Sequence, residues 1–123
     1  MVESHNKLIV LVTGSNGLVG RNLKQLVTNL TTPKSDYTGA NSALAGQLSA
    51  LLIDEQAVFH FATRAEADLT SFDQTVALFK TVKPTHVLHT AARVGGLFAN
   101  MADKVQFWQE NIAINDNVIR ACH

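Results

Sequence analysis

The chain has 123 residues, of which 46% are hydrophobic and 16% charged, and ten Lys and Arg residues balance ten Asp and Glu residues. This length provides one domain with a hydrophobic core, and the composition is not that of a disordered chain. The zero net charge argues against binding of nucleic acid or of a membrane surface. The only cysteine, Cys122, excludes an internal disulfide and a cysteine-rich zinc site. We expect a cytoplasmic protein, because the apolar run at 8–12 is too short for a signal peptide or a membrane span.

Three strands and three helices are predicted to alternate along the chain. The run at 8–12 is continuously apolar and mostly β-branched, which is typical of a strand buried on both faces. Apolar residues then follow at helical spacing up to Leu30, with Pro33 just beyond. Ser71 precedes a later helical pattern and is predicted to be its N-cap. The predicted strands are 8–12, 57–61 and 85–89, and the predicted helices are 18–30, 72–82 and 102–122.

The segment 31–56 has the weakest pattern. Its first part contains Pro33, Gly39 and several Ser, Thr and Asn residues, which is typical of a surface loop. Four leucines within 43–53 allow one or two helical turns. The role of this segment stays open.

The sharpest local signal is the run GSNGLVG at 14–20, between the first predicted strand and the first predicted helix. Gly14 permits a tight turn with positive φ, Gly17 lets a phosphate approach the backbone, and Gly20 lets the helix pack closely. A helix N-terminus offers free N–H groups and partial positive charge to a pyrophosphate. This context predicts a dinucleotide site in an α/β fold, the first half of a Rossmann-type doubly wound parallel sheet (β-α-β-α-β-α), truncated. The alternative is a tight turn that binds nothing.

The end of the second strand indicates which dinucleotide is expected. NAD-binding units usually carry Asp or Glu there, which bonds the ribose 2′-OH. Here Ala62, Thr63 and Arg64 follow the strand, and a guanidinium suits a 2′-phosphate. We therefore expect NADP(H), recognised by Arg64, with Arg21 as a second positive charge. Either arginine could instead be a solvated surface residue.

Several segments carry a family resemblance. The turn at 14–20 resembles that of the extended short-chain dehydrogenase/reductases, and ADLT at 67–70 resembles the loop that flanks the adenine ring in that superfamily. The segment PTHVLHTAARVGGL at 84–97 is similar to the third-strand segment of the GDP-L-fucose synthases. Residues 107–111 and 115–119 are similar to the next helix of those enzymes. Against this family, 31–56 resembles an insertion.

The resemblance implies an NADPH-dependent epimerase/reductase, homodimeric, that converts GDP-4-keto-6-deoxy-D-mannose into GDP-L-fucose. In that family a Ser, a Tyr-x-x-x-Lys pair, a Cys and a His act on the sugar, all beyond a fourth strand. Here Tyr37 is followed four residues later by Asn41, and Cys122 lies in the last predicted helix. We therefore expect no catalytic residue. Residues 1–123 are interpreted as a partial NADP(H)-binding domain that lacks the substrate domain and is inactive alone.

Truncation of the sheet is expected to promote association. In the strand order 3-2-1-4-5-6 the strand 8–12 is central, and without a fourth strand it becomes an edge that is apolar on both faces. We therefore expect the isolated chain to self-associate. The last predicted helix has no Gly, Asn or Pro stop signal, which favours a fragment.

A few polar residues carry weaker signals. His86 and His89 are three apart on a strand and face opposite sides, so we expect no metal site. Asn111 and Asn115 share a helix face, and an inward Asn needs hydrogen bonds, so Asn111 is expected to organise the backbone near the cofactor. The alternative is that these asparagines are exposed.

The small side chains after the third strand leave room for the ribose and nicotinamide, because ligands bind at the carboxyl ends of parallel strands. Two other functions stay open: a stand-alone NADP(H)-binding regulatory or interaction module, and another NAD-dependent nucleotide-sugar epimerase or dehydratase. The residues expected at the cofactor are Gly14, Ser15, Asn16, Gly17, Leu18, Val19, Gly20, Arg64, Asp68, Leu69, Ala91, Ala92, Val94 and Asn111.

Overall fold

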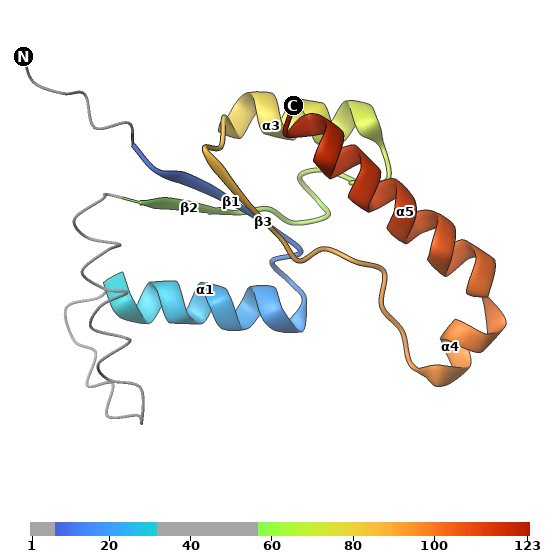
Figure 1. Ribbon diagram of the computed structural model, residues 1–123. Coiled ribbons are helices and arrows are strands. Elements are labelled where there is room, and N and C mark those ends of the chain that lie inside the picture. The colour runs from blue at the N-terminus through green and yellow to red at the C-terminus, as the bar shows by residue number, and fades with distance from the viewer. Residues whose placement is uncertain (1–6, 32–56) are drawn as a thin grey trace, which may run out of the picture.

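The computed structural model describes residues 7–31 and 57–123 (Figure 1). Apart from Thr31, the predicted insertion 31–56 and its helical turns lie outside the described residues. The strands are β1 (Ile9–Thr13), β2 (Val58–Phe61) and β3 (His86–His89), and the helices are α1 (Leu18–Thr31), α3 (Phe72–Val82), α4 (Leu97–Ala102) and α5 (Lys104–Ala121). Every predicted strand is present, shifted or shortened by one residue at its start.

The three strands form one parallel sheet in the order β2-β1-β3. Leu11 of β1 lies opposite His60 on one side and Val87 on the other. The expectation that 8–12 becomes an edge is therefore wrong. The connection from β2 passes over β1, so β3 pairs with the free side of β1. In the expected order 3-2-1-4 that position belongs to the fourth strand and not to the third. Within the described residues, β2 and β3 are the edges.

The helices cover both faces of the sheet. Figure 1 shows α1 below the sheet, and α3 with α5 above it. The connection from β1 to β2 runs through α1 on one face, and the connection from β2 to β3 passes over β1 through α3 on the other face, which confirms the predicted doubly wound fold. Beyond the carboxyl ends of β1 and β3 the chain turns to α1 on one face of the sheet and toward α5 on the other, and ligands bind at such a point in open α/β sheets.

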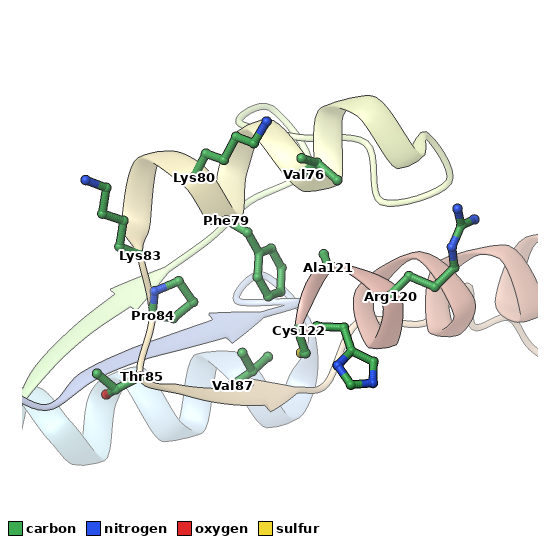
Figure 2. A pocket seen from close by; sticks show the side chains of 11 residues that line it. Val76, Phe79, Lys80, Lys83, Pro84, Thr85, Val87, Arg120, Ala121 and Cys122 are labelled. Atoms are coloured by element: carbon green, nitrogen blue, oxygen red, sulfur yellow. The ribbon is translucent and has the colours of Figure 1, made fainter.

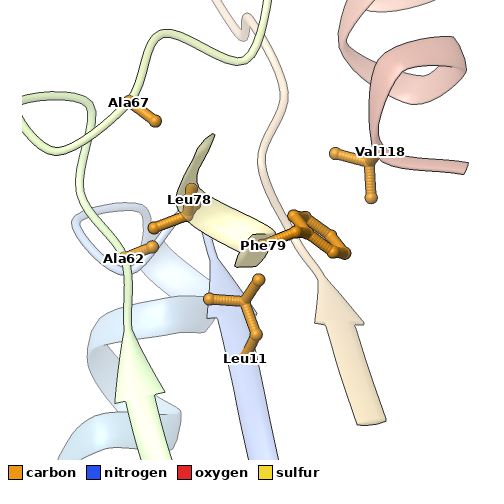
Figure 3. Packing of buried hydrophobic residues seen from close by; sticks show 6 residues of the cluster. All are labelled: Leu11, Ala62, Ala67, Leu78, Phe79 and Val118. Carbon is orange, nitrogen blue, oxygen red and sulfur yellow. The ribbon is translucent and has the colours of Figure 1, made fainter. Parts of the chain in front are cut away.

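The core lies between β1 and the helices α3 and α5. Leu11 is fully buried, and Phe79 of α3 and Val118 of α5 lie over it (Figure 3). Leu78, Ala62 and Ala67 complete the buried cluster. Burial of one large apolar side chain stabilises the fold by about 1.5–3 kcal/mol. The strongest apolar burial therefore falls on the middle strand.

The helix α3 has the predicted bounds because both of its ends are capped. The Ser71 side chain accepts a hydrogen bond from the Gln74 N–H. At the other end Lys83 adopts a left-handed conformation (φ 49°), and its N–H donates to the Phe79 carbonyl at 2.8 Å. Pro84 follows, so the helix ends there.

The helix predicted at 102–122 corresponds to α5, which begins two residues later and ends one residue earlier, while the short helix α4 before it was not predicted. Asp103 separates α4 from α5, and α4 begins directly after Gly96. The apolar pattern of this helix includes three residues that are exposed, because α5 packs through one face on α3. The exposed residues are Trp108, Ile112 and Ile119, and the buried ones are Phe107, Ile114 and Val118.

Two apolar residues of α1 also differ from expectation. Leu18 and Val19 belong to the apolar helical pattern that predicts α1, yet they are 75% and 61% exposed. They lie in the first turn of α1, beyond the end of β1, where no element covers them. No helix of the described ranges is long and apolar enough to cross a membrane.

Candidate functional site

The glycine turn joins the end of β1 to the start of α1 in a very tight path. Gly14 has φ +73°, as predicted for the first glycine. A Cβ on Gly20 would lie 2.3 Å from the Gly14 carbonyl oxygen, and a Cβ on Gly14 would lie 2.6 Å from the Ala91 nitrogen. Neither position accepts a side chain without movement of the backbone. The first and third glycines therefore allow the close packing that the sequence predicts.

The outer side of the turn forms a cradle that suits an anionic group. A Cβ on Gly17 would meet only the Gly14 oxygen, at 3.2 Å, so this backbone faces open space. The first N–H groups of a helix have no acceptor within the helix. The first turn of α1 contains no acidic residue to repel a negative charge. Asn16 and Leu18 are exposed beside it. These features fit the pyrophosphate of a dinucleotide.

Ser15 fastens the turn to the neighbouring strand. Its side chain is buried, and its hydroxyl donates to the Ala62 carbonyl at 2.7 Å. Its N–H points to the same oxygen at 3.4 Å. The hydroxyl of Ser15 therefore holds the ends of β1 and β2 together, and its contact with a cofactor stays a prediction.

Arg64 lies just past the carboxyl end of β2, and so at the same edge of the sheet as the glycine turn. Its side chain is 80% exposed and, among the described residues, forms one ion pair, with Nη2 3.6 Å from Asp68 Oδ2. Exposed ion pairs of this kind contribute little to stability. The guanidinium is therefore free to exchange this partner for a phosphate. Arg21 is also exposed, in the first turns of α1.

The loop that contains Asp68 and Leu69 is held by its own hydrogen bonds. Asp68 Oδ1 accepts from the Thr70 hydroxyl at 2.8 Å and from the Thr70 N–H at 3.0 Å. These two bonds, with a smaller contribution from Arg64, lower the pKa of Asp68 below the usual value of 3.8. The buried Asn117 of α5 donates to the Leu69 carbonyl at 2.9 Å. The position of this loop is thus set by α5, forty-eight residues further along the chain.

Sequence reasoning missed Glu66, which organises the turn after β2. Its carboxylate lies 2.7 Å from His60 Nε2 and accepts from the Thr63 N–H at 3.1 Å. Partial burial raises the pKa of Glu66, but the hydrogen bonds from His60 and Thr63 outweigh it, so the pKa is lowered. In the sequence, only the position of this acidic residue, two residues after Arg64, pointed to a role for Glu66 in the turn.

Asn111 holds the segment after β3. Its Oδ1 accepts from the Arg93 N–H at 2.9 Å, and its Nδ2 donates to the Arg93 carbonyl at 3.0 Å. Nδ2 also donates to the Phe107 carbonyl at 2.9 Å. The side chain thus binds Arg93 as a neighbouring strand would. The backbone role expected for Asn111 is present, and its closeness to a cofactor stays a prediction.

Arg93 itself was not singled out from the sequence. Its Nη1 donates to Glu110 at 2.7 Å, and its guanidinium carbon lies 4.3 Å from the centre of the Phe107 ring. Nη2 lies 3.8 Å from Asp103. These partners come from the helix that follows, so no local spacing could have revealed them. Beside this fixed residue, Ala92 and Val94 are exposed.

A cavity of about 690 Å³ lies at the opposite end of the sheet, between α3, β3 and α5 (Figure 2). Lys80, Lys83 and Arg120 border it, and Figure 2 shows the two lysines directed outward. Cations at helix C-termini are stabilised by the helix dipoles, which accounts for these residues. This cavity is not part of the predicted site. Among the residues with described positions, no three His, Cys, Asp or Glu side chains gather to hold a metal.

A parallel sheet with a glycine turn at its crossover point is typical of dinucleotide-binding domains. The chain belongs to the NAD dependent epimerase/dehydratase family, whose model matches residues 10–123.

Within this family the chain is similar to GDP-L-fucose synthases. It is 42% identical to the GDP-L-fucose synthase of Dictyostelium discoideum over 122 residues, which cover 99% of this chain and 31% of the relative. It is 41% identical to a probable GDP-L-fucose synthase of Drosophila melanogaster over 114 residues, 93% of this chain and 29% of the relative. The chain therefore spans less than a third of the length of these relatives.

A solved structure supports the same relationship. The GDP-L-fucose synthetase of Naegleria fowleri bound to NADP superposes with a TM-score of 0.63 and 25% identity. The match covers 94% of this chain and 26% of that one.

Proposed function

We propose that the chain is the NADP(H)-binding N-terminal part of a GDP-L-fucose synthase. The observation that carries this proposal is the cradle at the carboxyl end of β1, where Gly14 and Gly20 let α1 begin close to the strand ends and Gly17 presents a backbone without a Cβ beside the first turn of α1. The relatives named GDP-L-fucose synthase and the related structure bound to NADP support it.

The whole protein would convert GDP-4-keto-6-deoxy-D-mannose into GDP-L-fucose, with NADPH as the source of hydride. Proton removal beside a ketone needs a general acid or base, and residues of that kind are expected outside this chain. We therefore propose that the 123 residues bind the cofactor without turning over the GDP-sugar.

Each part of the site has a proposed role in binding. The N–H groups of the first turn of α1 would bind the pyrophosphate, which would approach over Gly17. Arg64 would leave Asp68 and bind the 2′-phosphate, which offers a stronger, charge-assisted partner. The loop at Asp68 and Leu69 would flank the adenine. Ala91, Ala92 and Val94 would line the ribose and nicotinamide, held in place by Asn111.

Titration of the chain with NADPH and with NADH, followed by nicotinamide fluorescence, tests this proposal. We expect saturable binding of NADPH and weaker binding of NADH. Arg64→Ala should weaken NADPH binding by about tenfold or more, since hydrogen bonds to charged groups contribute about 1.5–3 kcal/mol. Arg64→Ala should leave NADH binding unchanged. The control Lys80→Ala, at the far end of the sheet, should change the affinity for neither NADPH nor NADH. Absence of NADPH binding by a folded chain would contradict the proposal.

We further propose that a second copy of the chain is its partner, as in a homodimer, and that the protein is cytoplasmic. The exposed residues Val105, Trp108, Ile112 and Ile119 lie three, four and seven residues apart along α5, which is the spacing of a coiled-coil seam with the polar Asn115 at its remaining position. This stripe replaces the β1 edge as the reason for self-association. Trp108→Glu should convert dimers into monomers in sedimentation, and Lys104→Glu is the matched control. A wild-type chain that is monomeric at high concentration would contradict this partner.

A further inference from the structure

Three side chains connect β1, β3 and α5 directly behind the glycine turn. Thr13 Oγ1 lies 2.6 Å from His89 Nδ1, and His89 Nε2 lies 2.9 Å from Asn115 Oδ1. The Ala91 N–H points to Thr13 Oγ1 at 3.4 Å. Thr13 is completely buried, whereas Asn115 is exposed. A line of hydrogen bonds thus runs from the strand ends to the surface of α5.

Hydrogen-bond chemistry determines the direction of this line. A buried hydroxyl proton without an acceptor destabilises the fold, so the Thr13 hydroxyl must donate. Of its two described partners, the Ala91 N–H is a donor and only His89 Nδ1 can accept. His89 Nδ1 therefore carries no proton. The neutral ring carries its proton on Nε2, which donates to the Asn115 oxygen.

The line ends at the narrowest point of the candidate site. A Cβ on Gly14 would lie 2.6 Å from the Ala91 nitrogen and 2.8 Å from the Thr90 carbonyl carbon. Thr13 is bound from two sides, since the Thr90 hydroxyl also donates to its carbonyl at 2.6 Å. The Thr13 hydroxyl therefore helps to set the separation between the first glycine and the segment after β3.

We propose that His89 is a positioning residue for the dinucleotide site. As the neutral Nε2–H form it orients the Thr13 hydroxyl, and this hydroxyl fixes the Ala91 amide opposite Gly14. This inference rests on the proposed binding of NADP(H) at the glycine turn. His89 acts from behind the site and needs no contact with the cofactor.

Histidine and asparagine substitutions separate this role from a general effect on packing. His89→Leu removes the acceptor for Thr13, whereas His89→Asn keeps an amide oxygen close to the position of Nδ1. His86→Gln is the matched control, because His86 is an exposed histidine of the same strand whose ring lies 3.1 Å from the adjacent Thr85 hydroxyl. We expect His89→Leu to weaken NADPH binding by about five- to tenfold, the effect of one hydrogen bond. His89→Asn should restore affinity to within about twofold of wild type, and His86→Gln should leave it unchanged.

Nitrogen-15 NMR of the histidine rings in the wild-type chain provides a readout that does not depend on the variants. The His89 signals, assigned by their loss in His89→Asn, should show a protonated Nε2 and an unprotonated Nδ1. A protonated Nδ1 would overturn the inference, and so would a folded His89→Leu chain that binds NADPH like wild type. If the wild-type chain binds no NADPH, the proposed function fails, and the cofactor role of His89 fails with it. Tight wild-type binding that His89→Leu leaves unchanged overturns only the positioning role.

Discussion

Replacement of Gly20 by alanine tests the close packing of the glycine turn against a competing effect with the opposite sign. Gly20 is the third residue of α1. In a helix, alanine is favoured over glycine by about 0.8–1.0 kcal/mol, so helix propensity alone predicts a more stable chain. In this structure, however, the new Cβ would lie 2.3 Å from the Gly14 carbonyl oxygen and 2.6 Å from the Ser15 Cα.

The destabilisation expected for Gly20→Ala depends on which atoms must move to make room for the new Cβ. Both neighbours are backbone atoms, so no side chain can rotate to make room. Relief of the overlap requires α1 to shift away from the turn, and this shift strains the hydrogen bonds that Ser15 makes with Ala62. Overpacking of this kind costs about 1–3 kcal/mol and occasionally more. We expect the overlap to exceed the gain in propensity, with a net loss of up to about 2 kcal/mol.

Urea unfolding of wild type and Gly20→Ala, followed by circular dichroism, gives the change in the free energy of unfolding. Gly96→Ala is the control, since a Cβ there meets nothing within 4 Å. It should cost no more than about 1 kcal/mol, the effect of alanine in place of glycine at the N-cap of α4. NADPH binding by Gly20→Ala should also be weaker, because the turn and the helix N-terminus separate. A Gly20→Ala chain that is more stable than wild type would refute this account of the turn.

Three further predictions concern the polar contacts around the site. Asn117→Asp places a carboxylate against the Leu69 carbonyl and should lower the free energy of unfolding at pH 7 by about 1–3 kcal/mol, measured by urea unfolding. The loss should shrink at acid pH, where the new carboxyl is protonated and donates; a loss independent of pH would point to packing instead. Asp68 has a lowered pKa in the folded chain, so its bonds to Thr70 stabilise the fold above about pH 4 and are lost as the pH falls through the lowered value. Asp68→Asn should therefore weaken the dependence of stability on pH below about pH 4, and an unchanged dependence would exclude this carboxylate as its source. Asn111→Leu leaves the Arg93 backbone without partners and should accelerate hydrogen exchange at the Arg93 amide by about tenfold, whereas an unaffected rate would show that Arg93 is held by its side chain alone.

The strands and α3 could be predicted from the sequence because their signals are local. The apolar run at 8–12 fixes the nature of β1, and Ser71 and Pro84 mark the two limits of α3 within a few residues. The glycine spacing at 14–20 likewise reports a backbone path that only glycine permits.

The strand order and the supporting contacts could not be predicted in the same way. Nothing in the residues of β3 states on which side of β1 it pairs, since the apolar pattern is the same for either neighbour. The bond between His89 and Asn115 spans 26 residues, and that between Asn117 and Leu69 spans 48. The break at Asp103 carries no glycine or proline signal. The stripe around Trp108 has helical spacing, which indicates an apolar face without showing whether the partner belongs to the same chain.

The middle position of β1 has a consequence for synthesis on the ribosome. β1 is the first strand to be made, but it pairs with β3 through Val10 and His86, which are 76 residues apart. At about 5–20 residues per second, the nascent chain carries this strand for about 4–15 seconds before its second neighbour exists. During that time Val10, Leu11 and Val12, all buried in the finished fold, lack their neighbour strand β3 and are exposed on that side. The most deeply buried strand is therefore the segment of this chain that a chaperone would meet first.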